Sequence, residues 1–420
     1  MSKILIKNIR QLVQVRHEHA DKVCGREMSE LPCISDAWLA IDNGLIADLG
    51  EMKDFPGIAD WHGLEVIDAN EKMVFPAWVD SHTHIVYAGS REQEFADRIK
   101  GLSYEEIAKR GGGILNSAEK LHHASEEELV QQTLPRLQEI ISQGTGAVEI
   151  KSGYGLSLAS ELKMLRVIKK LKELSPLTIK ATFLGAHAYP AAFRENKRKY
   201  IDLIIEEMIP AVAGEKLAEF IDVFCEQNYF SFDETVEILE AGKKYGLTPK
   251  VHAEQLSHHG GVKAGVQCGA VSVDHLEYVN DEDIKILSGS GTMPTILPGA
   301  AFFLSLPNPP ARQMIDAGLP LAIASDFNPG SSPSGNMNLM QSIACVQYKL
   351  TPHETINAST VNTAYAMNVG KELGSITIGK KANIFITKKI PSVEFLPYSF
   401  GSNLIDMVIL NGKVCYRTHE

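Results

Sequence analysis

The sequence has little cysteine, and no two cysteines are spaced as a disulfide or zinc pair. Six cysteines are scattered through 420 residues without a Cys-x-x-Cys motif. In so long a chain this predicts reduced thiols. The first 15 residues lack a charged-then-apolar signal pattern, and no apolar run approaches the roughly 20 residues that span a bilayer. We therefore expect a cytoplasmic protein without membrane contact, and a periplasmic binding protein is disfavoured.

An excess of basic residues is also missing. The chain has 41 Lys and Arg against 52 Asp and Glu, a formal net charge of -11. This balance argues against a nucleic-acid partner and favours an enzyme acting on a small molecule. Hydrophobic residues make up 44% and charged residues 22%, as in ordinary globular proteins. We expect a homodimer, although the residues themselves leave the oligomeric state open.

Both ends of the chain are β-rich. Asp42-Asn43-Gly44 separates two short apolar runs and predicts a hairpin. Near the other end, residues 374–376, 383–387 and 408–410 show the same β-rich pattern, and the turn Asn411-Gly412 follows. We predict one small β-sandwich domain built from residues 1–73 and 373–420. Two unrelated terminal extensions are the alternative.

The middle of the chain, residues 74–372, alternates short apolar segments with 3.6-periodic segments such as 157–174 and 232–245. Alternating strands and helices predict a parallel sheet, and eight units predict a closed (β/α)8 TIM-like barrel. The eight strands are expected at 74–79, 147–150, 179–184, 220–224, 249–251, 271–273, 293–297 and 321–324.

Ionisable residues gather where these strands end, which is the catalytic end of such a barrel. His82 and His84 lie two positions apart after the first strand, so their side chains point to the same side. Two converging imidazoles suit a divalent metal ion, although a lone His-x-His is a weak signal. His187, His252 and His275 follow later strands. Each alone would be read as a hydrogen-bonded core histidine, but three at equivalent positions favour a common site.

Other polar residues extend this group. Asp326 ends the last strand and is a candidate ligand or proton shuttle, with a helix N-cap as the alternative. Arg91 could hold a carboxylate bidentately or be a solvated arginine. Tyr154 lies at a glycine-flanked strand end, and Tyr104 precedes three glycines as a lid or packing residue.

The motifs around these residues resemble the imidazolonepropionase family of the amidohydrolase superfamily. The similarity covers nearly the whole chain, and the segments around Arg91, the three glycines and Asn328 are specific to that family. The motifs are FPAWVDSHTH at 75–84, AGSRE at 88–92, SYEEI at 103–107, GGGI at 111–114, EIKSGYGL at 149–156, TFLGAH at 182–187 and SDFNPGS at 325–331.

The resemblance implies a metal-dependent hydrolase that opens the cyclic amide of 4-imidazolone-5-propanoate to N-formimidoyl-L-glutamate in histidine degradation. It implies one divalent ion, zinc or iron, because the end of the fourth strand has no lysine to bridge two. The implied metal ligands are His82, His84, His252 and Asp326. The implied catalytic residues are Asp326, His275 and Gln255. The implied substrate-binding residues are Arg91, Tyr104, Tyr154, His187, Gln255, Asn328, Gly330 and Ser331.

One position departs from the family pattern. Family members often carry an acidic residue three positions after the strand-five histidine, whereas this chain has Gln255 with Glu254 beside it. An amide can orient water by hydrogen bonds but cannot act as a base, so the identity of the base stays open among Asp326, His275 and Gln255. The alternative functions are a related deaminase of pyrimidines or purines, and a non-catalytic scaffold on the same barrel.

Overall fold

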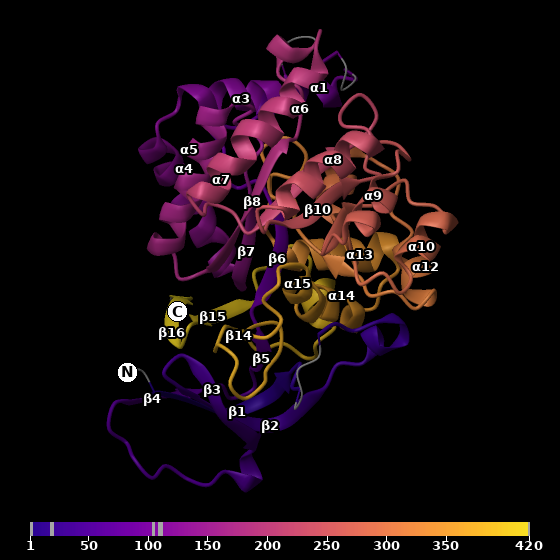
Figure 1. Cartoon of the computed structure of the whole chain (residues 1–420). Coiled ribbons are helices and arrows are strands. Elements are labelled where there is room, and N and C mark those ends of the chain that lie inside the picture. Colours follow the sequence, from indigo (N-terminus) through magenta and orange to yellow (C-terminus); the bar gives the residue numbers. More distant parts are fainter. Residues whose placement is uncertain (1–2, 17–20, 103–105, 108–111, 419–420) are drawn as a thin grey trace.

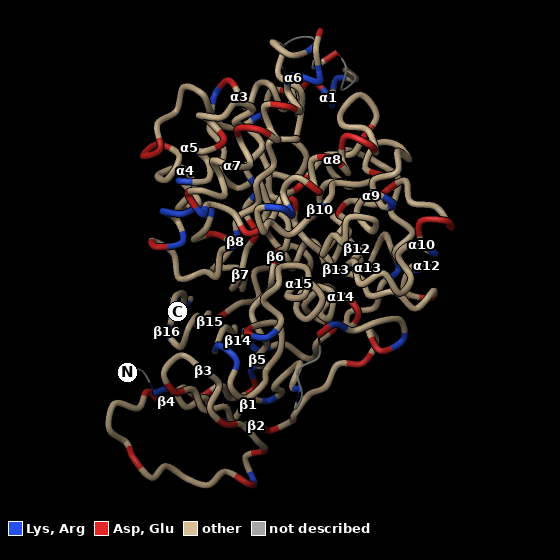
Figure 2. The backbone as a smooth tube through the Cα atoms, in the orientation of Figure 1, with Lys and Arg blue, Asp and Glu red and all other residues tan. Residues whose placement is uncertain are grey.

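The computed structural model describes residues 3–16, 21–102, 106–107 and 112–418, and it contains two sheets with a shell of helices (Figure 1). Acidic and basic residues are interspersed along the chain (Figure 2). Within the described part of the chain, no helix combines the length and the apolar character needed to cross a membrane.

Eight parallel strands form the barrel, and each pairs with its neighbour along the chain in the order β13-β12-β11-β10-β9-β8-β7-β6. The short segments with apolar runs form strands whose two faces are both buried. The strands are β6 (Trp78–Thr83), β7 (Thr145–Lys151), β8 (Thr178–Ala186), β9 (Phe220–Cys225), β10 (Thr248–Ala253), β11 (Ser272–His275), β12 (Met293–Ile296) and β13 (Ala322–Ile323). The predicted barrel is confirmed.

The barrel closes between its first and last strands without a regular ladder. A single parallel bridge joins Thr83 to Phe327, just beyond β13. Two backbone bonds flank it, from Asp326 N to the carbonyl of His82 at 3.0 Å and from His84 N to the carbonyl of Phe327 at 2.9 Å. Asp80 adds a side-chain clamp, because its carboxylate accepts bonds from the backbone N–H and the hydroxyl of Ser325. The chain segments that carry three predicted metal ligands thus meet at this seam.

Helices cover the outside of the barrel. The predicted helical segments 157–174 and 232–245 correspond to α5 and α8, and Ser157 and Ser231 cap their N-termini. The helices are α1 (Glu92–Ile99), α3 (Ile114–His123), α4 (Glu126–Ser142), α5 (Leu158–Leu174), α6 (Lys197–Leu203), α7 (Ile209–Gly214), α8 (Phe232–Lys243), α9 (Gly261–Cys268), α10 (Asp281–Leu287), α11 (Pro298–Leu304), α12 (Ala311–Asp316), α13 (Met337–Tyr348), α14 (Pro352–Ala358), α15 (Val361–Ala366) and α16 (Phe395–Tyr398).

The second sheet combines strands from both ends of the chain, in the order β16-β15-β14-β5-β1-β2-β3, with β4 also paired to β1 (Figure 1). Its strands are β1 (Lys3–Val13), β2 (Cys33–Asp42), β3 (Leu45–Glu51), β4 (Leu64–Asp68), β5 (Met73–Pro76), β14 (Ile384–Thr387), β15 (Ile405–Leu410) and β16 (Lys413–Arg417). The two predicted turns are present, and Asn43 and Asn411 both have the positive φ of a tight hairpin. The alternative of two unrelated terminal extensions is therefore wrong.

Two predicted strands differ from the structure. The segment 74–79 is not one barrel strand, because β5 pairs with β14 and β1 of the terminal sheet, whereas β6 begins the barrel at Trp78. At the break, Ala77 N donates to the carbonyl of Asn383 at 2.8 Å. In the described part of the chain, residues 374–376 form no strand and contribute one isolated bridge, between Ile376 and Val15. Apolar runs predicted these strands, but hydrophobicity alone does not say which sheet a strand joins.

Candidate metal centre and substrate cavity

Four predicted ligands converge at one end of the barrel. His82 and His84 come from the end of β6, His252 from β10, and Asp326 from the seam beyond β13, and all are at most 2% exposed. The Nε2 atoms of His84 and His252 lie 3.4 Å apart. One Asp326 oxygen lies 3.6 Å from His82 Nε2 and 3.7 Å from His84 Nε2. Three imidazoles and a carboxylate therefore face one small volume.

Two further carboxylates fix the orientation of these imidazoles from behind. Asp274 lies 2.6 Å from His82 Nδ1 through its Oδ2, and Asp222 Oδ2 lies 3.0 Å from His252 Nδ1. A carboxylate on Nδ1 favours a proton on that nitrogen. The lone pair of each Nε2 then points into the shared volume. This arrangement is the usual support for a metal-bound histidine.

The donor set fits a divalent metal ion. His82 Nε2 is buried and has no hydrogen-bond partner among the residues that the structure describes. Burial, with contributions from neighbouring cationic groups, holds the pKa values of His82 and His84 well below the usual value, so both rings are neutral and able to donate a lone pair. Overlapping triads of donor atoms lie within 4.8 Å of one another, and they include His82, His84 and Asp326. Neutral imidazoles with one carboxylate suit zinc and equally suit iron.

A buried network of charges lies directly beneath the histidines. Lys151 Nζ contacts Glu149 at 2.6 Å and Asp222 at 2.8 Å, and it lies 3.8 Å from Asp274. Lys250 also pairs with Glu149 and lies 3.9 Å from Asp274. Two lysines and three carboxylates, all with 0% exposed side chains, give this network a formal net charge of minus one. That charge complements a bound cation.

The backbone is strained at two positions of the site. His275 has φ 94° and Asp326 has φ 54°, both in the left-handed region that side chains other than glycine rarely adopt. Such strain persists only where surrounding contacts hold it, and it concentrates at functional sites. The backbone N–H of Asp326 donates a hydrogen bond to the carbonyl of His82, which holds the strained turn. The ring nitrogens of His275, His82 and His252 lie close enough together to share a metal ion.

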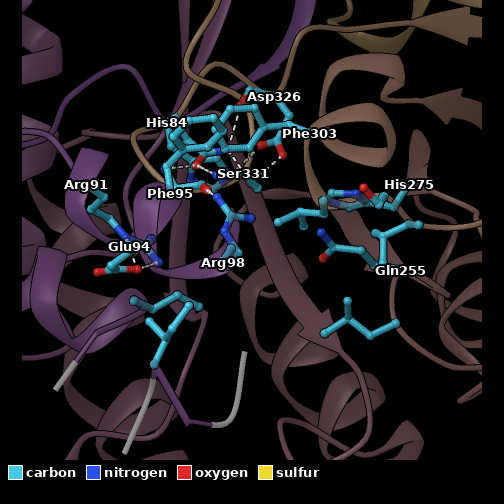
Figure 3. A pocket seen from close by; sticks show the side chains of 18 of the residues that line it. His84, Arg91, Glu94, Phe95, Arg98, Gln255, His275, Phe303, Asp326 and Ser331 are labelled. Carbon is cyan, nitrogen blue, oxygen red and sulfur yellow. Dashed lines mark hydrogen bonds and ion pairs between the residues drawn. The ribbon is translucent and has the colours of Figure 1, made fainter. Parts of the chain in front are cut away.

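A cavity of about 490 Å³ opens above the cluster, within the range that holds small ligands. It is lined by His84, His187, His252, His275 and Asp326, by Arg91, Tyr154, Gln255, Asn328, Gly330 and Ser331, and by Arg98, Phe95 and Phe303. In Figure 3, Asp326 and His84 lie at one end, with His275 and Gln255 on one side and Arg91 on the other. The cavity brings together every predicted site residue among those described except His82, which lies beneath it. Tyr104 lies outside the described residues.

The cavity walls are held by buried polar contacts. His187 Nδ1 lies 2.9 Å from the carbonyl of Gly153. Burial, helped by His252, lowers the pKa of His187 to about 3, so the ring is neutral, its Nδ1–H donates to Gly153 and its Nε2 is an acceptor. Asn328 accepts from the backbone N–H groups of Gly330 and Ser331 at 2.7 and 2.8 Å, and this turn closes the wall beside Asp326.

Sequence reasoning missed several charged residues around the site. Glu149, Asp222 and Lys250 are inward-pointing charges on strands that read as apolar runs. The available signal was that residues two positions apart in a strand point to the same face. Lys250 therefore shares a face with His252, and Glu149 shares one with Lys151. Arg98 follows Arg91 by seven residues, two turns of α1, and so returns to the same side of the helix.

Comparison with known proteins places the chain in a family. The model of the amidohydrolase family matches residues 73–415. An imidazolonepropionase of Christiangramia forsetii is 59% identical over 98% of this chain and 99% of its own length. Another, of Alkaliphilus oremlandii, is 42% identical over 98% and 97%.

Solved structures show the same fold at much lower identity. The E. coli guanine deaminase structure matches with a TM-score of 0.74 and 13% identity, and each chain is covered in full. An adenosine deaminase from Xanthomonas campestris with bound zinc matches with a TM-score of 0.72 and 16% identity over 98% and 92%. Similarity this distant gives no support to the deaminase alternative. The sequence relatives decide the family, and the chain belongs to the imidazolonepropionase family of the amidohydrolases.

Proposed function

We propose that the protein hydrolyses the ring amide of 4-imidazolone-5-propanoate to N-formimidoyl-L-glutamate, the cyclic-amide step of histidine degradation. The observation that carries this proposal is the convergence of three imidazoles and Asp326 at the base of a cavity that also contains Arg91. The three histidines and Asp326 suit metal-dependent hydrolysis, and Arg91 suits a substrate with a carboxylate tail. We also propose that the enzyme is a cytoplasmic homodimer.

The residues that would hold a single divalent ion, zinc or iron, are His82, His84, His252 and Asp326. Such an ion would lower the pKa of water toward neutrality and polarise the amide carbonyl. Asp274 and Asp222 lie 2.6 and 3.0 Å from the Nδ1 atoms of His82 and His252, and these contacts would orient the two rings toward the ion. Lys151 contacts Asp222 and lies near Asp274, which ties the two supports together.

Hydrolysis of an amide requires a group that takes a proton from water and gives it to the departing nitrogen. Asp326 is placed for both steps, because one carboxylate oxygen faces His82 and His84 while the other accepts from the Ser331 hydroxyl at 3.2 Å on the cavity side. His275 and Gln255 line the side of the cavity opposite Arg91 (Figure 3). Gln255 can only orient water or substrate through its amide, so we assign the proton transfer to Asp326 and an orienting role to His275 and Gln255.

The remaining cavity residues would hold the substrate. His187 presents Nε2 as an acceptor, which suits an N–H group of the imidazolone ring. Tyr154 packs beside His84 and His187, with ring centroids 5.8 and 5.6 Å away, and lines the same cavity. Arg91 suits the carboxylate tail. Asn328, Gly330 and Ser331 suit the amino-acid end of the product.

The direct test is incubation with freshly generated imidazolone propionate, following the loss of its ultraviolet absorbance, with cytosine and guanine as comparison substrates. We expect turnover of the imidazolone alone, with about one equivalent of metal per chain by elemental analysis. In Arg91→Ala we expect a strongly raised KM with metal content unchanged. Deamination of cytosine or guanine without imidazolone turnover would overturn the proposal, and an unchanged KM would remove Arg91 from the substrate site.

A further inference from the structure

Glu161 is a buried carboxylate on α5 that the proposed chemistry does not use. Its residue exposure is 0%, although α5 belongs to the helices that cover the barrel. One carboxylate oxygen accepts from the backbone N–H groups of Gly155 and Leu156, at 2.8 and 2.9 Å. The other oxygen accepts from the backbone N–H of Gly153 at 3.2 Å. Three donors of the loop that follows β7 therefore converge on one side chain.

This loop has a conformation that the chain does not adopt by itself. Gly153 has φ 103° and Leu156 has φ 50°, so both ends of the loop lie in the left-handed region. A Cβ atom on Gly155 would lie 2.4 Å from the backbone nitrogen of Glu161 and 2.7 Å from its carboxylate. Such geometry persists only where surrounding contacts hold it, and the Glu161 carboxylate supplies three of those contacts.

The same loop reaches the cavity. Tyr154 lies within it and lines the cavity, and the carbonyl of Gly153 lies 2.9 Å from Nδ1 of His187. The hydroxyl oxygen of Ser152 accepts from the backbone N–H of Leu184 at 2.9 Å, which ties the loop to β8. Glu161 is not among the described residues that line the cavity. It can therefore affect a bound molecule only through the residues that it holds.

We propose that Glu161 is a positioning residue for the substrate ring, which it serves by fixing the loop 153–156. In this conformation the Gly153 carbonyl accepts from Nδ1 of His187, and Nε2 of that ring stays an acceptor inside the cavity. This inference rests on the proposed function, in which Nε2 of His187 accepts from an N–H group of the imidazolone ring. The chain of contacts runs from α5 to the loop, from the loop to His187, and from His187 to the substrate.

Removing the carboxylate should disturb this chain at its first contact. Glu161→Gln keeps the size of the side chain but replaces one acceptor oxygen by an NH2 group that faces backbone N–H donors. The loop would then leave its left-handed geometry, and the Gly153 carbonyl would no longer hold the proton of His187 on Nδ1. With a proton on Nε2, the ring would face the imidazolone N–H donor against donor.

A double-mutant cycle in kcat/KM for the imidazolone tests this route, with rates normalised to bound metal. In the parent background, Glu161→Gln should lower kcat/KM about tenfold or more, the effect of one mispaired buried hydrogen bond. In a His187→Ala background the loss should be at least about threefold smaller, because the two residues act in series. Equal losses in both backgrounds would overturn the inference, since they would show that Glu161 acts on the fold and not through His187.

The ¹⁵N chemical shifts of the histidines in the zinc-loaded protein give a readout that needs no substrate. The signal that disappears in His187→Ala should show a proton on Nδ1 in the parent and a shift toward Nε2–H in Glu161→Gln. If Glu161→Gln does not fold, Gly155→Ala tests the same claim, because its methyl group would push the loop away from the carboxylate. An unchanged Nδ1–H form in the folded variant would overturn the inference. Absence of imidazolone turnover by the parent enzyme would instead reject the proposed function.

Glu354→Gln provides a matched control. Glu354 is also a buried carboxylate on a helix, 3% exposed, and it accepts from the backbone N–H of Thr351 at 2.7 Å. It is not among the described residues that line the cavity. Glu354→Gln should lower stability while leaving kcat/KM per bound metal and the His187 signal unchanged.

Discussion

Asp274→Asn tests whether the carboxylates behind the histidines build the metal site. Asp274 lies 2.6 Å from His82 Nδ1, and both side chains are fully buried. Asparagine keeps the shape and one acceptor oxygen, so the substitution removes mainly the negative charge. Because the buried network then changes from one net negative charge to none, the imidazole becomes a poorer donor and a cation above it is less favoured.

The expected loss is about 10- to 100-fold in metal affinity, the range typical of residues that support a metal-bound histidine, equivalent to roughly 1.4 to 2.7 kcal/mol. The assay titrates metal-free protein with Zn²⁺ in competition with a chromogenic chelator, so it reports binding without reference to catalysis. Thermal unfolding of the metal-free variant checks that the fold is retained.

Glu354→Gln is the control for losing a buried, paired carboxylate elsewhere. Glu354 is 3% exposed and pairs with Arg312 at 2.8 Å while capping α14, away from the histidines. It should lower stability without changing the zinc dissociation constant. If Asp274→Asn bound zinc as tightly as the parent, the argument that Asp274 supports the site would be refuted, even if activity were lost.

Three further predictions concern His84, Gly330 and Lys380. His84→Ala should lose bound metal and activity together, and stoichiometric metal in the purified variant would exclude His84 as a ligand. Gly330→Ala should raise KM about tenfold or more with metal retained, because the added methyl lies 2.1 Å from Arg91 Nη1 and Glu94 holds that side chain from the other side; unchanged steady-state kinetics would contradict this. Burial, with Arg16 adding to it, lowers the pKa of Lys380 to about 8. Between that value and about 10.4 the folded chain has released this proton while the unfolded chain retains it, so stability should rise with pH relative to Lys380→Met, by at most about 1.4 kcal/mol per pH unit. Urea unfolding of both proteins at several pH values from 7 to 10 measures the difference, and parallel curves would argue against a depressed pKa.

The barrel was predictable because most of its strands contain a short apolar run that is followed by polar residues. Burial on both faces demands such runs, and the helices between them leave a 3.6-residue period. The strand ends also predicted that the histidines would gather. His187, His252 and His275 all follow apolar runs, and the ends of parallel strands meet at one face of a barrel.

Contacts between strands distant in the chain were harder to anticipate. Asp222 was hidden inside an apolar run and Asp274 stood between a short apolar run and His275. Their partners, His252 and His82, are defined by the pairing of distant strands rather than by spacing. The break at Ala77 was equally invisible, because residues on both sides of it are fully apolar and differ only in the sheet they join. Hydrophobic patterning reports that a residue is buried, and the pairing partner depends on the whole fold.

The seam of the barrel explains why the donor set forms at all. His82 and His84 lie on one side of it and Asp326 on the other, and the regular ladder between β6 and β13 is replaced by one bridge and a few specific bonds. A complete ladder would hold Asp326 in extended geometry, whereas the opening allows the left-handed turn at φ 54° that directs its carboxylate to the histidines. The Asp80 clamp on Ser325 restores the closure that the missing ladder would have provided. The departure from regular strand pairing is therefore the feature that allows one carboxylate to meet histidines from the first and fifth strands.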